Sequence, residues 1–87
     1  MDNRSKALEW KKKGNVEFKA KNFKEASEHY SEAIKLDPND HVFFSNRSGC
    51  YTSLGKFEEA LSDADICIEI KPDWPKGYTR KAQVYEA

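Results

Sequence analysis

The stretch FKEASEHYSEAIKLDP (residues 23–38) returns in altered form as FEEALSDADICIEIKP (residues 57–72). The two copies begin thirty-four residues apart, and five residue types recur in register: phenylalanine, glutamate, alanine, isoleucine and proline. A further shift by the same distance places Phe44 on Tyr78. Small, aromatic and proline positions that repeat together indicate a tandem structural repeat and not chance self-similarity.

A period of this length is typical of the tetratricopeptide repeat (TPR), in which each unit is one helix-turn-helix. Gly14 and Ala26 are small enough to let paired helices approach closely, whereas Pro38 and Pro72 cannot continue a helix and close their units. Asp40 can cap the helix that follows. We therefore expect an all-α fold, a right-handed superhelix of antiparallel helix pairs, with five helices near residues 5–20, 23–36, 41–54, 57–70 and 75–86.

The repeat frame divides the chain into a lead-in, residues 1–6, and three units. Residues 7–40 and 41–74 form two complete units, and residues 75–87 supply only the first helix of a third. The apolar side chains of that helix then lack a partner helix: Tyr78, Ala82 and Tyr85. Either this helix caps the domain or the chain is a fragment of a longer protein, which we favour. An uncovered apolar stripe of this kind would favour self-association by helix exchange.

Composition favours one small domain built from thin amphipathic helices, because 38% of the 87 residues are hydrophobic and 34% are charged. The formal net charge of zero argues against binding to nucleic acid or to a membrane. No apolar run approaches a membrane span and the first residues have no signal-peptide character, so we expect a soluble, cytoplasmic protein. Cys50 and Cys67 are expected to be buried thiols.

The sequence contains no motif for catalysis or metal binding. It has no phosphate-binding loop, no dinucleotide fingerprint and no HExxH. His29 and His41 fall in different expected helices without a cysteine at ligand spacing, so a metal site is not expected. The acidic residues lie mainly on the second helix of each unit, where no cleft would shield a catalytic pair. We expect a protein that is not an enzyme and that uses no cofactor.

Charge alternates from one expected helix to the next. The net charges are +5 for residues 4–21, −3 for 22–40, +1 for 41–54, −4 for 55–70 and +2 for 71–87. The first helix of each unit is therefore basic and the second is acidic. In stacked helix pairs the first helices line the concave surface, which predicts a cationic groove on an anionic body. The alternative, that Lys11-Lys12-Lys13 is only a solvated helix face, leaves this alternation unexplained.

Five polar side chains on the first helices occur at spacings that would bring them to one surface. Lys11 and Asn15 lie four residues apart, as do Lys76 and Arg80, so each pair shares a helix face. Asn46 lies on the middle first helix. A carboxylate is held best by several donors that converge from different directions, and lysine, arginine and asparagine supply such donors. The pattern predicts a site for an anionic group.

The segments KKKGN (residues 11–15), SNRS (45–48) and KGYTRK (76–81) resemble the carboxylate-clamp TPR domains of co-chaperones. The resemblance is greatest to the N-terminal TPR domain of the Hsp70/Hsp90-organising co-chaperone family and extends from about Ala7 to the end of the chain. It implies an adaptor that binds the C-terminal Glu-Glu-Val-Asp of a heat-shock chaperone, with a preference for the 70-kDa class.

The resemblance also implies a role for each of the five clamp residues. Lys11, Asn15 and Asn46 would hold the terminal carboxylate of the tail. Lys76 and Arg80 would hold the aspartate side chain and the neighbouring backbone.

Some alternatives remain open at this point. The tail could belong to the 90-kDa chaperone, or the module could serve oligomerisation with an incidental basic groove. Gly49, one turn after Asn46, is usually alanine in the family, so its missing methyl group could alter the groove floor and the choice of aliphatic residues in the peptide. The simpler reading of Gly49 is sequence drift. Family members complete the third unit and add a capping helix, so without these the groove would be less rigid.

Overall fold

The computed structural model describes residues 2–87, and this part of the chain forms five α-helices. They are α1 (Asn3–Lys19), α2 (Phe23–Leu36), α3 (His41–Ser53), α4 (Phe57–Ile70) and α5 (Pro75–Glu86). The expected all-α fold and the number of helices are confirmed. Three of the expected spans agree with the structure at both ends: those of α2, α4 and α5.

Aspartate side chains cap the helices that open the first two units. Asp2 caps α1, where its carboxylate accepts a hydrogen bond from the backbone N–H of Ser5 at 2.7 Å. This cap starts α1 at Asn3, two residues earlier than expected, so most of the expected lead-in is helical. Asp40 caps α3 as predicted, accepting a hydrogen bond from the backbone N–H of Val42 at 2.8 Å.

The turns inside the first two helix pairs have the same geometry. Lys21 follows α1 with a φ of 65°, and Gly55 follows α3 with a φ of 76°, at equivalent places in the two repeats. In both turns the N–H of the next residue donates to a carbonyl five residues earlier at 2.8 Å. A left-handed residue with a Cβ costs roughly 1 kcal/mol, so the first turn is the more strained of the two.

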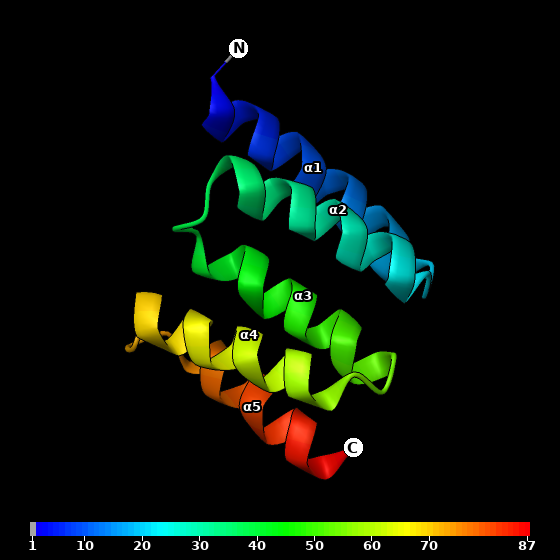
Figure 1. Ribbon diagram of the computed structural model, residues 1–87, viewed down its shortest axis with the longest axis vertical. Coiled ribbons are helices and arrows are strands. Elements are labelled where there is room, and N and C mark those ends of the chain that lie inside the picture. Colours follow the sequence, from blue (N-terminus) through cyan, green and yellow to red (C-terminus); the bar gives the residue numbers. More distant parts are fainter. Residues whose placement is uncertain (1) are drawn as a thin grey trace.

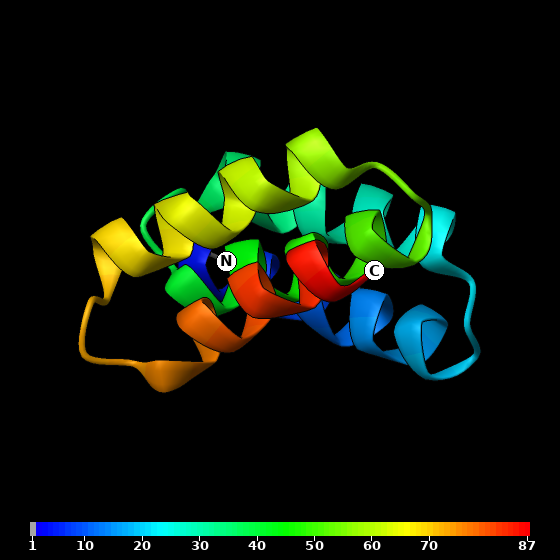
Figure 2. The ribbon, with the colours of Figure 1, turned by 90° about the horizontal axis from the view of Figure 1, so that it is seen from below.

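The helices form antiparallel pairs that stack side by side, so that each helix packs on the next in the chain (Figure 1). Figure 2 shows that α1, α3 and α5 lie in one layer and that α2 and α4 lie in the other. α5 also packs against α3. The layering brings the first helices of the three units together on one side of the molecule, where the functional residues were expected.

Small residues allow the helices of a pair to approach closely. One buried cluster consists of Ala7, Ala33 and Phe43, and a second consists of Ala26, Tyr30 and Cys50. Gly14 of α1 faces the ring of Tyr30 on α2, and a methyl group at Gly14 would lie 2.5 Å from that ring. The two cysteines are free and fully buried, as expected.

Replacing Gly14 with alanine is expected to lower the free energy of unfolding by about 1–3 kcal/mol, because the added methyl group would overpack the contact with Tyr30. Urea denaturation followed by circular dichroism measures this change. Ser62→Ala, at an exposed position of α4, controls for the helix propensity of alanine and should not lower stability. An equal stability of Gly14→Ala and the unmodified chain would contradict the close approach of α1 and α2.

The outer side of α5 is exposed. Tyr78 is 51% exposed and Tyr85 is 70% exposed, and Ala82 is exposed as well. Within residues 2–87, no helix covers this stripe. Over the same residues, no helix is long and apolar enough to cross a membrane.

Candidate functional site

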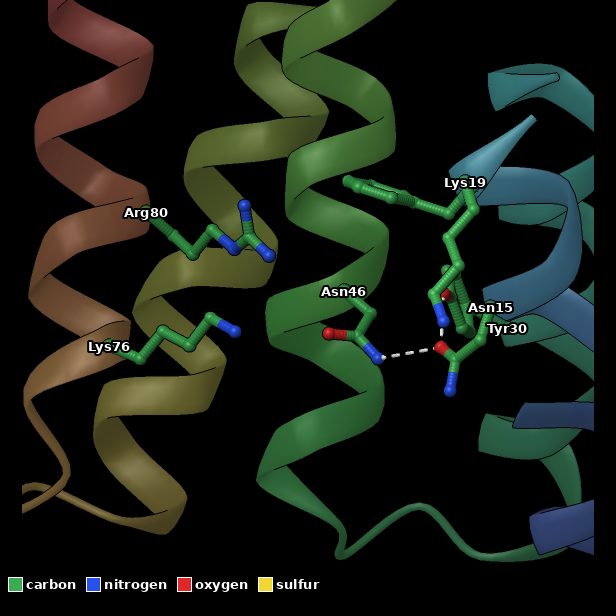
Figure 3. Close-up of a pocket in the computed structure, with 7 residues that line it drawn as sticks. Asn15, Lys19, Tyr30, Asn46, Lys76 and Arg80 are labelled. Atoms are coloured by element: carbon green, nitrogen blue, oxygen red, sulfur yellow. Dashed lines mark hydrogen bonds between the residues drawn. The ribbon is translucent and has the colours of Figure 1, made fainter. Parts of the chain in front are cut away.

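A pocket of about 190 Å³ opens between α1, α3 and α5. Its walls are formed by seven residues: Asn15, Phe18, Lys19, Tyr30, Asn46, Lys76 and Arg80. Three of these side chains are basic and none is acidic. Figure 3 shows Lys76 and Arg80 reaching from α5 towards Asn46, while Asn15 and Lys19 face the same space from α1. The pocket is thus a cationic hollow in the layer of first helices.

Four of the five predicted clamp residues line this pocket, and they come from three helices. The fifth, Lys11, is half-buried on α1 one turn before Asn15 and is not part of the lining. Phe18, Lys19 and Tyr30 were not among the predicted residues. Lys19 could have been found, because it continues the row of Lys11 and Asn15 at the same four-residue spacing.

Tyr30 orients the amide of Asn15 from below the pocket. Its hydroxyl donates a hydrogen bond to Asn15 Oδ1 at 2.6 Å, and Asn46 Nδ2 donates to the same oxygen at 3.5 Å. Burial raises the pKa of Tyr30 above its ordinary value, so the hydroxyl keeps its proton and remains a donor. These bonds fix the orientation of the amide, and the Asn15 Nδ2 group, which makes no hydrogen bond within residues 2–87, can donate to a ligand.

Arg80 is a half-buried cation whose side chain donates hydrogen bonds to neutral groups. Its Nε donates to Ser45 Oγ at 3.3 Å and its Nη1 to Gln83 Oε1 at 3.2 Å. No carboxylate within residues 2–87 forms an ion pair with it. Burial lowers the pKa of Arg80, because partial removal from water disfavours the charged form. An anion from outside the chain would relieve this cost.

Arg47 is neutralised within the fold, unlike Arg80. Its guanidinium donates to both carboxylate oxygens of Asp63 at 2.8 Å and to Ser31 Oγ at 3.0 Å. Arg47 carries the net charge of +1 counted for residues 41–54, and because Asp63 neutralises it, the middle first helix adds no free positive charge to the groove. Asp63 likewise does not lie on an outward acidic surface, because its side chain is only 3% exposed.

Gly49 is buried on α3 next to the Arg80 guanidinium and is not part of the pocket lining. A methyl group at this position would lie 2.8 Å from Arg80 Nη1 and 3.3 Å from Phe18 Cε2. The Arg80 guanidinium therefore fills the space left by the missing methyl group. This space is not open to the aliphatic residues of a peptide, although the sequence had raised that possibility. The structure instead gives Gly49 the role of letting Arg80 lie close to α3.

The fold and the pocket define a helical-repeat module whose first helices form a basic groove. The family model described as the TPR repeats of BSK1-like serine/threonine-protein kinases matches residues 1–82. The chain therefore belongs to the tetratricopeptide repeat family. The matched part of these kinases is their repeat region.

Curated proteins of high similarity are chaperone-organising proteins. The Hsp70-Hsp90 organising protein of Plasmodium falciparum is 51% identical over 93% of this chain, which spans 32% of that relative. The heat shock protein STI1 of Saccharomyces cerevisiae is 51% identical over 85% of this chain, which spans 13% of it. The chain is thus closely related to one TPR domain of these longer proteins. This kinship confirms the prediction that it is not an enzyme.

Solved TPR domains share the same backbone arrangement. The first TPR of Spaghetti (RPAP3), bound to the HSP90 peptide SRMEEVD, has a TM-score of 0.92 and 32% identity, with 95% of this chain and 66% of that chain covered. The TPR2B domain of yeast Sti1 in its complex with pHsp70 has a TM-score of 0.91 and 33% identity, with 94% and 66% covered. The TPR fold is therefore confirmed.

Proposed function

We propose that this chain is a co-chaperone adaptor module that binds the acidic C-terminal tail of a heat-shock chaperone, and that the tail is the Glu-Glu-Val-Asp end of the 70-kDa class. The observation that carries the proposal is the half-buried guanidinium of Arg80, which has no carboxylate partner in the described residues and lies beside three other donors. Solved domains of similar structure are bound to an HSP90 peptide and form a complex with pHsp70, and the preference for the 70-kDa class comes from the resemblance to the N-terminal domain.

The proposed clamp divides the tail's last residue between two sets of donors. Lys11, Asn15 and Asn46 hold the terminal carboxylate, and the free Nδ2 of Asn15 supports this role. On the other wall, Lys76 and Arg80 hold the aspartate side chain. The Lys76 side chain is exposed and forms no ion pair within residues 2–87.

The strength of such a complex follows from opposing contributions. Hydrogen bonds to charged groups contribute about 1.5–3 kcal/mol each, but ordering a flexible tail offsets much of this gain. We expect a micromolar dissociation constant, equivalent to about −8 kcal/mol. Because the attraction is between charges near the surface, binding should weaken as salt concentration rises.

Amidation of the tail's C-terminus is expected to weaken binding about 10- to 100-fold. The amide removes the terminal negative charge, and with it the charge-assisted hydrogen bonds of Asn15 and Asn46. Isothermal titration calorimetry of the chain with free-acid and amidated peptides ending in Glu-Glu-Val-Asp measures the difference. Equal affinity for the two peptides would rule out a clamp on the chain end.

The same titration with C-terminal peptides of the 70-kDa and the 90-kDa chaperones tests the assigned class, and tighter binding of the 90-kDa peptide would overturn that part of the proposal.

The exposed Tyr78 and Tyr85 favour a second function, assembly through the outer side of α5. Sedimentation of the free chain tests it, since an assembly module should form oligomers without any peptide.

A further inference from the structure

The pocket contains one cation that the five-residue clamp does not include. Lys19 lies in the last turn of α1, one turn beyond Asn15, and is part of the pocket lining. Figure 3 shows its side chain extending from α1 among the residues that line the pocket. Its side chain is exposed and forms no ion pair with any carboxylate of residues 2–87. Lys19 is thus available to an anionic ligand.

Both negative charges of the tail's last residue are already assigned to clamp residues other than Lys19. An aspartate at the end of a chain carries two carboxylates, one at its terminus and one on its side chain. The proposed clamp assigns both of them to other residues, among them Lys76 and Arg80. Because the lining has a third basic side chain and no acidic one, the pocket is matched to a ligand with at least one more negative charge.

We propose that Lys19 binds the side-chain carboxylate of the residue two positions before the end of the tail, and so selects tails that are acidic there. This inference rests on the proposed function. Four residues of helix advance about 6 Å from Asn15 to Lys19, and two residues of extended peptide advance about 6.6 Å. Because Asn15 holds the terminal carboxylate in the proposed clamp, these matching advances bring the residue two positions before the end to Lys19 when the tail runs along α1. In Glu-Glu-Val-Asp it is a glutamate.

A lysine at this place also has a purely structural explanation. Basic side chains near the C-terminus of a helix interact favourably with the helix dipole, and Lys19 lies in the last turn of α1. That role would affect the stability of the helix, and would change affinity for every tail by the same factor. A role in recognition requires that the effect of Lys19 depend on the charge of one peptide residue.

A double-mutant cycle separates the two roles. Calorimetry would compare the unmodified chain and Lys19→Ala, each with a peptide ending in Glu-Glu-Val-Asp and with one ending in Glu-Gln-Val-Asp. Lys19→Ala is expected to weaken binding of the first peptide about three- to fivefold and to leave binding of the second within about twofold. Lys12→Ala is the matched control, because Lys12 is an exposed lysine of α1 outside the pocket. It should weaken both peptides equally and by less than about twofold.

The outcomes distinguish this inference from the proposed function. If the unmodified chain binds the tail but Lys19→Ala has no effect, or weakens both peptides by the same factor, the role of Lys19 is overturned and the clamp is retained. If the unmodified chain does not bind the free-acid tail at all, both proposals are overturned. Thermal unfolding of Lys19→Ala measures the contribution to the helix separately.

Discussion

Replacing Arg80 with methionine is expected to weaken binding of a free-acid Glu-Glu-Val-Asp tail by about 30-fold or more while leaving the thermal stability of the chain unchanged or slightly higher. The loss corresponds to the 2–5 kcal/mol typical of removing one partner from a desolvated charge pair. Stability should not fall, because Arg80 has no anionic partner within residues 2–87 and burial already lowers its pKa. Calorimetry and thermal unfolding of the same sample measure both quantities.

Two further variants make this test specific to the guanidinium. Lys81→Met removes a neighbouring positive charge that pairs with Asp65 at 2.9 Å outside the pocket, and it should change affinity by less than about twofold. Arg80→Lys keeps the charge but loses the planar fork, so an intermediate affinity is expected. Undiminished tail binding by Arg80→Met would remove the main support for the proposed function.

Replacing Asp63 with alanine is expected to lower the free energy of unfolding by about 3–5 kcal/mol. The reason is the Arg47 guanidinium, which is 19% exposed and would be left without its bidentate carboxylate. Arg47 also contacts Ser31, so the pair joins α3 to α4 and to α2. Urea denaturation followed by circular dichroism gives the change, which for a domain of this size is a large share of its total stability.

Replacing both partners provides the control for the buried pair. The double variant Arg47→Met, Asp63→Leu removes both charges and fills the space with apolar atoms, and it should regain most of the stability lost by Asp63→Ala. A loss of about 1 kcal/mol or less for the single variant would be the value of an exposed ion pair. That result would contradict the burial of Asp63 described above.

Local signals in the sequence were sufficient for most of the fold. Pro38 and Pro72 correctly predicted where the first two units end, and the thirty-four-residue register predicted the bounds of α2, α4 and α5. The N-terminus of α1 was missed because residues 3–6 are all polar or charged, so the periodic apolar pattern begins after the cap at Asp2. The identity of Lys21 gave no sign of its left-handed conformation, because glycine is the residue type that normally marks such a turn. In this chain glycine occurs at the equivalent position of the second repeat, Gly55.

The candidate site was predictable where its residues follow helix spacing and not where partners come from other helices. Asn15, Lys76 and Arg80 were placed by four-residue intervals on α1 and α5. Charge counting could not tell that Arg47 is neutralised, since its partner Asp63 lies sixteen residues away on another helix. The same limitation applies to the space above Gly49, which only the packed structure assigns to Arg80.

The hydrogen bond between the Tyr30 hydroxyl and the Asn15 amide links the orientation of a donor group in the pocket to the packing of the hydrophobic core. Tyr30 is 1% exposed and belongs to a core cluster with Ala26 and Cys50, yet its hydroxyl decides which way a surface amide is turned. Repacking of the cluster that positions Tyr30 can therefore turn the Asn15 amide without any substitution on α1, α3 or α5.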